Sequence, residues 1–301
     1  MKIALSGRSE PASQFRECLE RGGFQLQTQS WGCDLVLSFK PKLPRLGKSP
    51  KILCLDSFES LDHGESRHHS ERIIRSVQRA SGVVLPSKYS LERFNFHFPS
   101  FPEDSILVHS PPRNEVRPLE QNEYAKILCE LGINRPFFFH LPGNEHDPSI
   151  PVSIQAFQSS QAPIAGMQFV LPQEVSQANR IPGLLCLPKL SPNQIHALHS
   201  AAEAVIAPKQ GAHNPSQLIE ALQCGACGVA MDSGAYPETL QGAWPLGDSK
   251  DSHSFARILD RQLIDPHFRR EICAASLRRS SEILREDSGE RLYDFLNGFL
   301  E

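Results

Sequence analysis

The sequence lacks the features that would place the chain in a membrane or on a polyanion. No stretch approaches the roughly 20 consecutive apolar residues that a membrane-spanning helix needs. The first residues, Met1–Gly7, turn polar too quickly for a secretory signal peptide. A formal net charge of -3 over 301 residues gives no general attraction to nucleic acid. We therefore expect a cytoplasmic protein without a nucleic-acid partner.

A disulfide framework is also missing. The eight cysteines are scattered, several of them inside apolar runs, which is typical of buried reduced thiols in a cytosolic protein. Only Cys224 and Cys227 have the spacing of a redox motif. They follow a predicted helix instead of preceding one, so no helix dipole lowers the pKa of a thiol there. The spacing favours buried thiols over a redox role.

No group of residues has the spacing of a metal site. Three histidines and two acidic residues lie within one short stretch (Asp62, His63, Glu65, His68 and His69). Nothing in that spacing demands ligands that converge at fixed geometry, so a solvated loop is the favoured interpretation. His196 and His199 share a predicted helix face without a third ligand, which favours exposed polar positions. We expect neither a metal nor a cofactor.

Short apolar runs alternate with helical patterns along the whole chain. With 40% hydrophobic and 22% charged residues, the sequence suits a soluble globular protein, and its length suits two domains. Strands are predicted at 2–5, 25–29, 34–39, 51–55, 82–85, 106–109, 137–141, 168–171, 184–187, 204–207 and 228–231. Helices are predicted at 14–21, 123–131, 151–157, 173–179, 254–263, 269–284 and 290–300, with shorter ones between. This alternation is typical of parallel α/β sheets.

The stretch 204–240 has the clearest signals for where its strands and helices begin and end. After the strand 204–207, Asn214 can cap a helix, Pro215 suits its first position, and Gly225 ends it. Ligands of parallel sheets bind at the carboxyl ends of strands, near helix N-termini. The partial positive charge at such an N-terminus suits a phosphate. We therefore expect the ligand near Asn214.

Glu220 lies more than one turn into this helix. It falls off the apolar stripe that Leu218, Ala221 and Leu222 form. A carboxylate at this position can accept hydrogen bonds from sugar hydroxyls. The alternative is a solvated helix residue, and the spacing alone does not decide between the two.

The segment Ala204–Leu240 resembles the donor-binding region of family-four glycosyltransferases, which have the GT-B fold. Glu220–Gly225 and the loop Ser233–Glu238 carry the resemblance, which extends more diffusely to Ala80–Phe94 and Asp104–Pro118. It implies two Rossmann-like α/β domains facing each other across a cleft. The resemblance places the acceptor-side domain at residues 1–118 and the nucleotide-sugar-side domain at 119–301.

Three parts of the family pattern are missing. Ala212 stands eight residues before Glu220, where the family has a first glutamate. Asp147 and Pro148 stand where an arginine and a lysine would clamp the donor diphosphate, and a carboxylate repels phosphate. The family's histidine near the end of the fourth strand is absent, and Asp56 is the only polar candidate in that region.

The resemblance implies a retaining, metal-free transfer of a sugar from a nucleotide-sugar to an unknown acceptor. The residues expected to bind the donor are Gly143, Asn144, Lys189, Gly211, Asn214 and Glu220. Those expected to act in catalysis are Gln210 and His213, as substitutes for the lost carboxylate, and Asp56 on the acceptor side. No metal is needed where helix dipoles and basic groups carry the charge.

A second hypothesis belongs to another class. The three missing parts favour a GT-B-shaped binding or scaffolding subunit that no longer catalyses, because groups that act together are not easily replaced singly. The acceptor, which is a glycan, a lipid-linked sugar or a small molecule, stays open. Peripheral membrane contact and a partner subunit also stay open.

Overall fold

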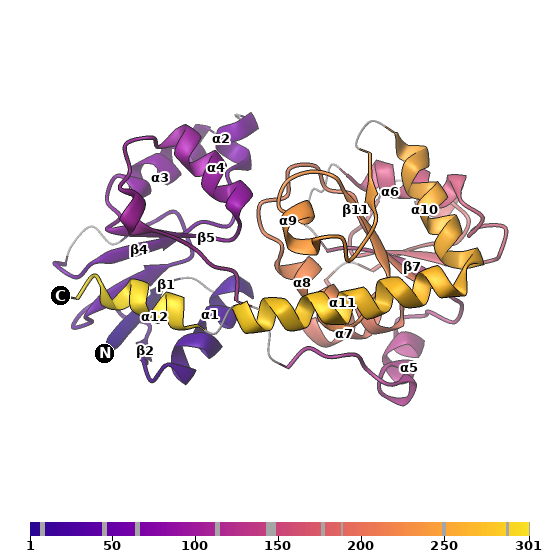
Figure 1. The fold of residues 1–301 in the computed structure, drawn as a ribbon, viewed down its shortest axis with the longest axis horizontal. Coiled ribbons are helices and arrows are strands. Elements are labelled where there is room, and N and C mark those ends of the chain that lie inside the picture. The colour runs from indigo at the N-terminus through magenta and orange to yellow at the C-terminus, as the bar shows by residue number, and fades with distance from the viewer. Residues whose placement is uncertain are drawn as a thin grey trace. The chain divides into compact units, whose positions relative to one another are not determined.

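The computed structural model describes residues 1–6, 10–43, 47–63, 67–111, 115–142, 149–175, 178–187, 189–248, 251–286 and 289–300 (Figure 1). The chain forms two compact units. Unit 1 comprises Met1–Arg113, His213–Ser216 and Leu284–Glu301, and unit 2 comprises Asn114–Ala212 and Gln217–Ile283. The packing therefore assigns two short segments of the expected C-terminal domain to the N-terminal unit.

Unit 1 is built on a six-stranded parallel sheet in the order β2-β1-β3-β4-β5-β6. Its strands are β1 (Lys2–Ser6), β2 (Gln25–Gln27), β3 (Leu35–Ser38), β4 (Lys51–Cys54), β5 (Gly82–Leu85) and β6 (Ile106–Val108). Successive side chains of a strand point to opposite faces, and both faces here are covered. In β5, for example, Val83 and Leu85 join one apolar cluster and Val84 joins the other.

The helices of unit 1 cover both faces of that sheet. They are α1 (Glu10–Arg21), α2 (Glu59–His63), α3 (Arg67–Val77), α4 (Lys88–His97) and α12 (Glu290–Asn297), with a 3-10 turn at Glu103–Ser105. Figure 1 shows α1 and α12 on one side of the strands and α2, α3 and α4 on the other. Leu292 and Leu296 of α12 are fully buried in the cluster that also holds Ile3 and Leu19. The last helix thus completes the core of the N-terminal unit.

Unit 2 has a second parallel sheet, in the order β12-β11-β10-β7-β8-β9. Its strands are β7 (Phe137–His140), β8 (Gln168–Leu171), β9 (Leu184–Cys186), β10 (Ala204–Ala207), β11 (Gly228–Met231) and β12 (Leu246–Gly247). The chain runs outward from β7 through β8 to β9 and then returns to the other side of β7 with β10. This reversal puts the topological switch point, where such sheets bind ligands, at the carboxyl ends of β7 and β10.

The helices of unit 2 enclose a core rich in phenylalanine. They are α5 (Gln121–Glu130), α6 (Ile150–Ser159), α7 (Pro192–Ala201), α8 (Ser216–Gln223), α9 (Tyr236–Leu240), α10 (Ser252–Ile264) and α11 (Pro266–Glu286), with a 3-10 turn at Ala178–Arg180. Phe138, Phe139, Phe157 and Phe169 are fully buried among them. Within the described residues, no helix is both long enough and apolar enough to cross a bilayer.

Two local predictions are wrong. The expected α-helix at 173–179 is absent over its described part, where only Ala178 and Asn179 belong to a 3-10 turn; Val175 is the one apolar side chain there that packs on the core. So little burial does not support a helix. The expected solvated loop around Asp62 is instead helical, in α2 and α3, although His68 and His69 are exposed as expected.

Candidate functional site

Two loops at the carboxyl edge of the unit 2 sheet are fixed to each other. The Gly211 amide donates a hydrogen bond to Ser233 Oγ at 3.0 Å, and the Ala235 amide donates one to the Ala212 carbonyl at 2.8 Å. Gly234 has φ +67°, and a Cβ there would lie 2.5 Å from both the nitrogen and the oxygen of Ala212. Glycine is thus required for the two loops to approach, and the surface they form is set before any ligand binds.

The expected donor-side residues of these loops differ in exposure. Gln210 is exposed at the turn after β10, and Gly211 is half-buried with φ +64°. Lys189 is exposed in the turn between β9 and α7, with φ +65°. A left-handed backbone costs a non-glycine residue about 1–2 kcal/mol, so the surrounding structure holds Lys189 in this conformation against that free-energy cost.

Glu220 is not a solvated residue. Its exposed fraction is 4%, and the six residues 218–223 of α8 are all buried, so burial includes the expected stripe of Leu218, Ala221 and Leu222 and extends beyond it. A glutamate is almost never buried this deeply without compensation, because its charge loses hydration. Burial raises the pKa of the Cys224 thiol to about 12, and the nearby charge of Glu220 adds to that rise. The carboxyl group of Glu220 is therefore held in the interior of unit 2, near Cys224.

Part of the expected donor site lies outside the described residues. This applies to Gly143 and Asn144 and equally to Asp147 and Pro148. The described chain ends on this side at Pro142, two residues after β7, and resumes at Ser149, directly before α6.

His213 is buried within unit 1 and is 3% exposed. Its ring lies 5.4 Å from the ring of Phe58 and 5.1 Å from that of Tyr89. Its carbonyl oxygen accepts hydrogen bonds from Ser87 Oγ at 2.7 Å and Ser90 Oγ at 3.2 Å. Both the side chain and the backbone of His213 therefore anchor this segment to unit 1.

Asp62 gathers three basic side chains around one carboxylate. It accepts hydrogen bonds from Arg93 and, at 2.8 Å, from His97 Nε2, while His213 Nε2 lies 3.4 Å from its other oxygen. Burial raises the pKa of Asp62, but the hydrogen bonds from Arg93 and His97 outweigh this, so its pKa falls below the ordinary value. The sequence interpretation missed this cluster, although Arg93 and His97 are four residues apart on one face of α4.

Asp56 and Asn214 are brought together, as members of unit 1. Asp56 follows β4 and accepts a hydrogen bond from Asn214 Nδ2 at 3.4 Å. Asn214 Oδ1 accepts from the Ser216 amide at 2.9 Å, so it caps α8 as predicted. Burial raises the pKa of Asp56 to about 6, with the Asn214 hydrogen bond opposing the rise. The carboxyl group lines a small hollow at the ends of β4, β5 and β6 that also includes His109.

The expected site residues thus divide between the units. Unit 1 holds Asp56, His213 and Asn214. Unit 2 holds Lys189, Gln210, Gly211 and Glu220. Asp56 and Asn214 in unit 1, and Lys189, Gln210 and Gly211 in unit 2, lie beside the carboxyl ends of parallel strands, where α/β sheets bind their ligands.

Comparison with known proteins identifies the architecture. No protein-family model and no curated protein matches the chain. Solved structures match it over nearly its whole length. Sucrose-phosphate synthase from Thermosynechococcus elongatus has a TM-score of 0.76 at 12% identity, covering 99% of this chain and 98% of its own. The chain has the GT-B fold.

Two further GT-B structures match equally well. HepE from Anabaena, solved in complex with UDP and glucose, has a TM-score of 0.78 at 15% identity and covers 99% of this chain and 100% of its own. WaaG, a glycosyltransferase involved in lipopolysaccharide biosynthesis, has a TM-score of 0.77 at 13% identity with the same coverage. The fold class predicted from the sequence is confirmed, with one six-stranded parallel sheet in each unit.

Proposed function

We propose that the chain is a glycosyltransferase that transfers a sugar, with retention, from a nucleotide-sugar to an acceptor hydroxyl. The observation that carries this proposal is the fixed pair of loops at 208–212 and 232–235, at the edge of the unit 2 sheet where ligands bind. The likeness to HepE, which binds UDP and glucose, supports a uridine nucleotide as the first donor to test.

Glu220 is the proposed ligand of the donor ribose. Carboxylate oxygens accept hydrogen bonds from both hydroxyls of a ribose, and the buried position of Glu220 keeps its oxygens from turning into water. Glu220 also coincides with the second glutamate of the family pattern. Lys189 is the proposed partner of a phosphate, since it is exposed and sits in a turn after β9.

Asp56 is the proposed acceptor-side base. A carboxyl group with a pKa near 6 is ionised at pH 7 yet accepts a proton more readily than an ordinary aspartate. Perturbed carboxyl groups in a hollow at strand ends are typical of functional sites. The corresponding test is the pH dependence of turnover, in which Asp56→Asn should remove a limb near pH 6.

The sugar-proximal role is proposed for Gln210. Gln210 is exposed beside Gly211, whereas His213 contacts Asp62 and Ser90 at 3.4 Å and would have to leave both to reach a sugar. Ala212, which stands in place of the family's first glutamate, is 3% exposed and offers no polar side chain.

The binding or scaffolding subunit is the second candidate, and Ala212 is the observation that favours it. Titration calorimetry with UDP, UDP-glucose and other sugar nucleotides separates the two. We expect binding of a sugar nucleotide with micromolar to millimolar affinity, weakened in Glu220→Gln and unchanged in Glu130→Gln, an exposed glutamate on α5. No heat with any nucleotide would leave only the subunit hypothesis. Binding of a sugar nucleotide without any sugar transfer would reject the catalytic hypothesis.

A further inference from the structure

Cys227 and Cys273 meet where β11 begins beneath α11. Cys227 is 2% exposed, Cys273 is half-buried and packs against the core cluster that holds Cys227, and a hydrogen bond joins the two thiol groups. Neither position was predicted to pair with the other, because they are far apart in sequence. Cys224, which has the redox-motif spacing from Cys227, does not take part: burial raises the pKa of its thiol to about 12.

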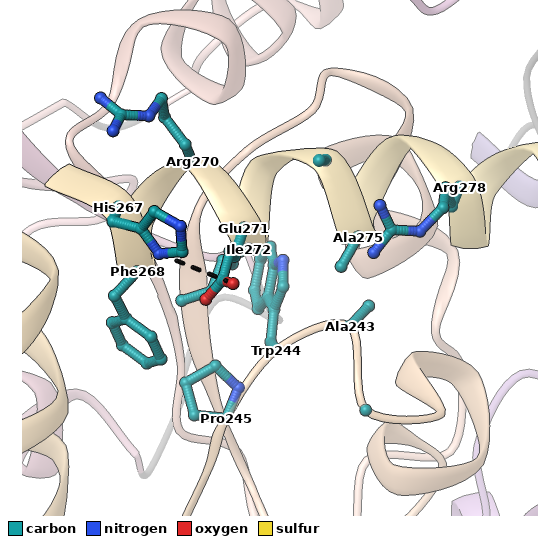
Figure 2. A pocket seen from close by; sticks show the side chains of 12 residues that line it. Ala243, Trp244, Pro245, His267, Phe268, Arg270, Glu271, Ile272, Ala275 and Arg278 are labelled. Carbon is teal, nitrogen blue, oxygen red and sulfur yellow. Dashed lines mark ion pairs between the residues drawn. The ribbon is translucent and has the colours of Figure 1, made fainter.

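The backbone on either side of this thiol pair is fixed. Ser276, one turn after Cys273, donates a hydrogen bond from Oγ to the Ala226 carbonyl at 2.7 Å. Trp244 Nε1 donates to Ser276 Oγ at 2.8 Å and to the same carbonyl at 3.1 Å. Figure 2 shows the Trp244 ring lying against α11. The residues adjoining both cysteines are thus held together independently of the sulfur atoms.

The pKa values of the two thiols shift in opposite directions. The hydrogen bond with Cys227 lowers the pKa of the Cys273 thiol below its ordinary value; burial opposes this, and the charge of Arg269 assists it. The same hydrogen bond and burial raise the pKa of Cys227 far above its ordinary value. Because the thiolate is the nucleophile in thiol chemistry and Cys273 is also the more exposed of the two cysteines, Cys273 is the reactive partner.

Cys273 lines a hollow at the protein surface, whereas Cys227 is buried. Cys273 lines a surface hollow of about 310 Å³ together with Glu203, Gln262, Leu263, Pro266, Arg269 and Arg270. Arg269 forms an ion pair with Glu203 and lies on the same helix as Cys273, one turn earlier. A reagent that enters the hollow therefore meets one thiolate beside an ordered guanidinium group.

We propose that Cys227 and Cys273 form a redox modification site that takes a small disulfide compound as oxidant, with Cys273 attacking and Cys227 resolving. The Cys273 thiolate attacks one sulfur of the compound, its S–S bond breaks, and one thiolate leaves. The Cys227 thiol gives its proton to that leaving thiolate and attacks Cys273, releasing the second thiolate, which takes up a proton from solvent. The two cysteines lose two electrons, and the compound is reduced to two thiols. The site is independent of the proposed transferase activity.

The test uses the full-length protein and oxidised glutathione at pH 7.5, followed by peptide mapping without reduction. We expect an internal Cys227–Cys273 disulfide that dithiothreitol reverses. Alkylation by iodoacetamide at pH 7 should label Cys273 several times faster than Cys129, which is exposed on α5 and serves as the reference thiol. Slower labelling of Cys273 than of Cys129, or recovery of both cysteines as free thiols after oxidation, would overturn the proposal.

Two variants separate the roles of the cysteines. Cys227→Ala should retain a stable mixed disulfide with glutathione at Cys273, because the resolving thiol is gone. Cys273→Ala should leave Cys227 unmodified. Circular dichroism reports whether each variant is folded. If either variant is unfolded, peptide mapping of the wild-type protein alone tests the proposal. A mixed disulfide that persists at Cys273 in the wild-type protein would show that Cys227 does not resolve it and would also reject the site.

Discussion

Asp56 Oδ1 lies 3.4 Å from Nδ2 of Asn214, a residue 158 positions further along the chain. The same asparagine caps α8 through its other side-chain atom. The side chain of Asn214 therefore contacts both the N-terminus of α8 and a carboxyl group whose pKa is about 6. This coupling makes the charge of Asp56 a property that can be measured through stability as well as through activity.

Asp56→Asn should stabilise the protein above pH 6. Burial raises the pKa of Asp56 from 3.8 to about 6, so the folded protein binds this proton more tightly than the unfolded chain. Stability from this group is thus full below pH 4 and is lost as the pH rises through 6. At pH 7.5 we expect the variant to gain about 1–3 kcal/mol in free energy of unfolding, and to gain nothing at pH 4.

Urea denaturation at the two pH values checks this prediction. The exposed Asp104→Asn variant is the matched control and should change little at either pH. A gain for Asp56→Asn that is equal at pH 4 and pH 7.5 would show that burial does not raise the pKa of the Asp56 carboxyl group.

Asp62→Asn should destabilise unit 1 by about 1–3 kcal/mol, because it leaves the partly buried Arg93 guanidinium and His97 ring without their carboxylate acceptor. The pKa of Asp62 is lowered, so its contribution is present at neutral pH and is lost on acidification below the ordinary aspartate range. The measurement is chemical denaturation at pH 7. Glu71→Gln, which breaks exposed pairs with Arg67 and Arg75, should cost less than about 1 kcal/mol. Equal costs for the two variants would contradict the importance of the Asp62 cluster.

Gly234→Ala should damage both stability and nucleotide binding. Its φ of +67° and the 2.5 Å approach to Ala212 leave no room for a Cβ without separating the two loops. Gly242→Ala is the control, since φ is +86° there but nothing lies within 4 Å of the added atom. Both variants pay for the left-handed backbone, about 1–2 kcal/mol, and only Gly234→Ala should lose nucleotide affinity. Calorimetric titration of the two variants checks this prediction. Equal nucleotide affinities would show that the two loops are not part of the donor site.

Lys189→Ala should weaken nucleotide-sugar binding several-fold by removing a cation from the diphosphate, and the loss should shrink as salt is raised. Lys126→Ala on α5, an exposed lysine, is the control and should bind like the wild-type protein. Backbone strain at position 189 is the same for lysine and alanine, so stability should not confuse the comparison. An unchanged affinity would assign phosphate binding to other groups.

Oxidation of the Cys227–Cys273 pair should raise thermal stability. Closing a loop of about 46 residues is worth up to about 4 kcal/mol in the chain-entropy description. Thermal melts before and after treatment with oxidised glutathione should differ, and dithiothreitol should restore the first curve. A lower melting temperature after verified bridging would show that the bond strains α11.

The sequence predicted the strands well because parallel strands are buried on both faces and stand out as apolar runs. Gly228–Met231 and Ala204–Ala207 match the structure at both ends. The two-residue strand Leu246–Gly247 was not predicted, since it is too short to form a pattern. The cap at Asn214 followed from local chemistry, which a single sequence carries in full.

The site was harder to predict because its contacts join distant parts of the chain. Asp62 meets Arg93 across 31 positions, and His213 meets Ser87 across 126. The motif around Glu220 directed attention to the loops after β10 and β11, but nothing local showed that the residue is buried. Likewise, the amphipathic pattern of α12 predicted a helix without indicating which sheet its apolar face covers.

That last helix has a consequence for synthesis on the ribosome. Leu292 and Leu296 fill the N-terminal core, and the Tyr293 hydroxyl donates a hydrogen bond to the Cys18 carbonyl at 2.7 Å. Unit 1 therefore needs a helix that follows unit 2 in the chain before its hydrophobic interior is closed, whereas the core residues of unit 2 precede that helix. Nascent chains should consequently acquire their native structure in the reverse of the order in which they emerge, and a fragment that stops after residue 113 would present an open apolar surface to chaperones.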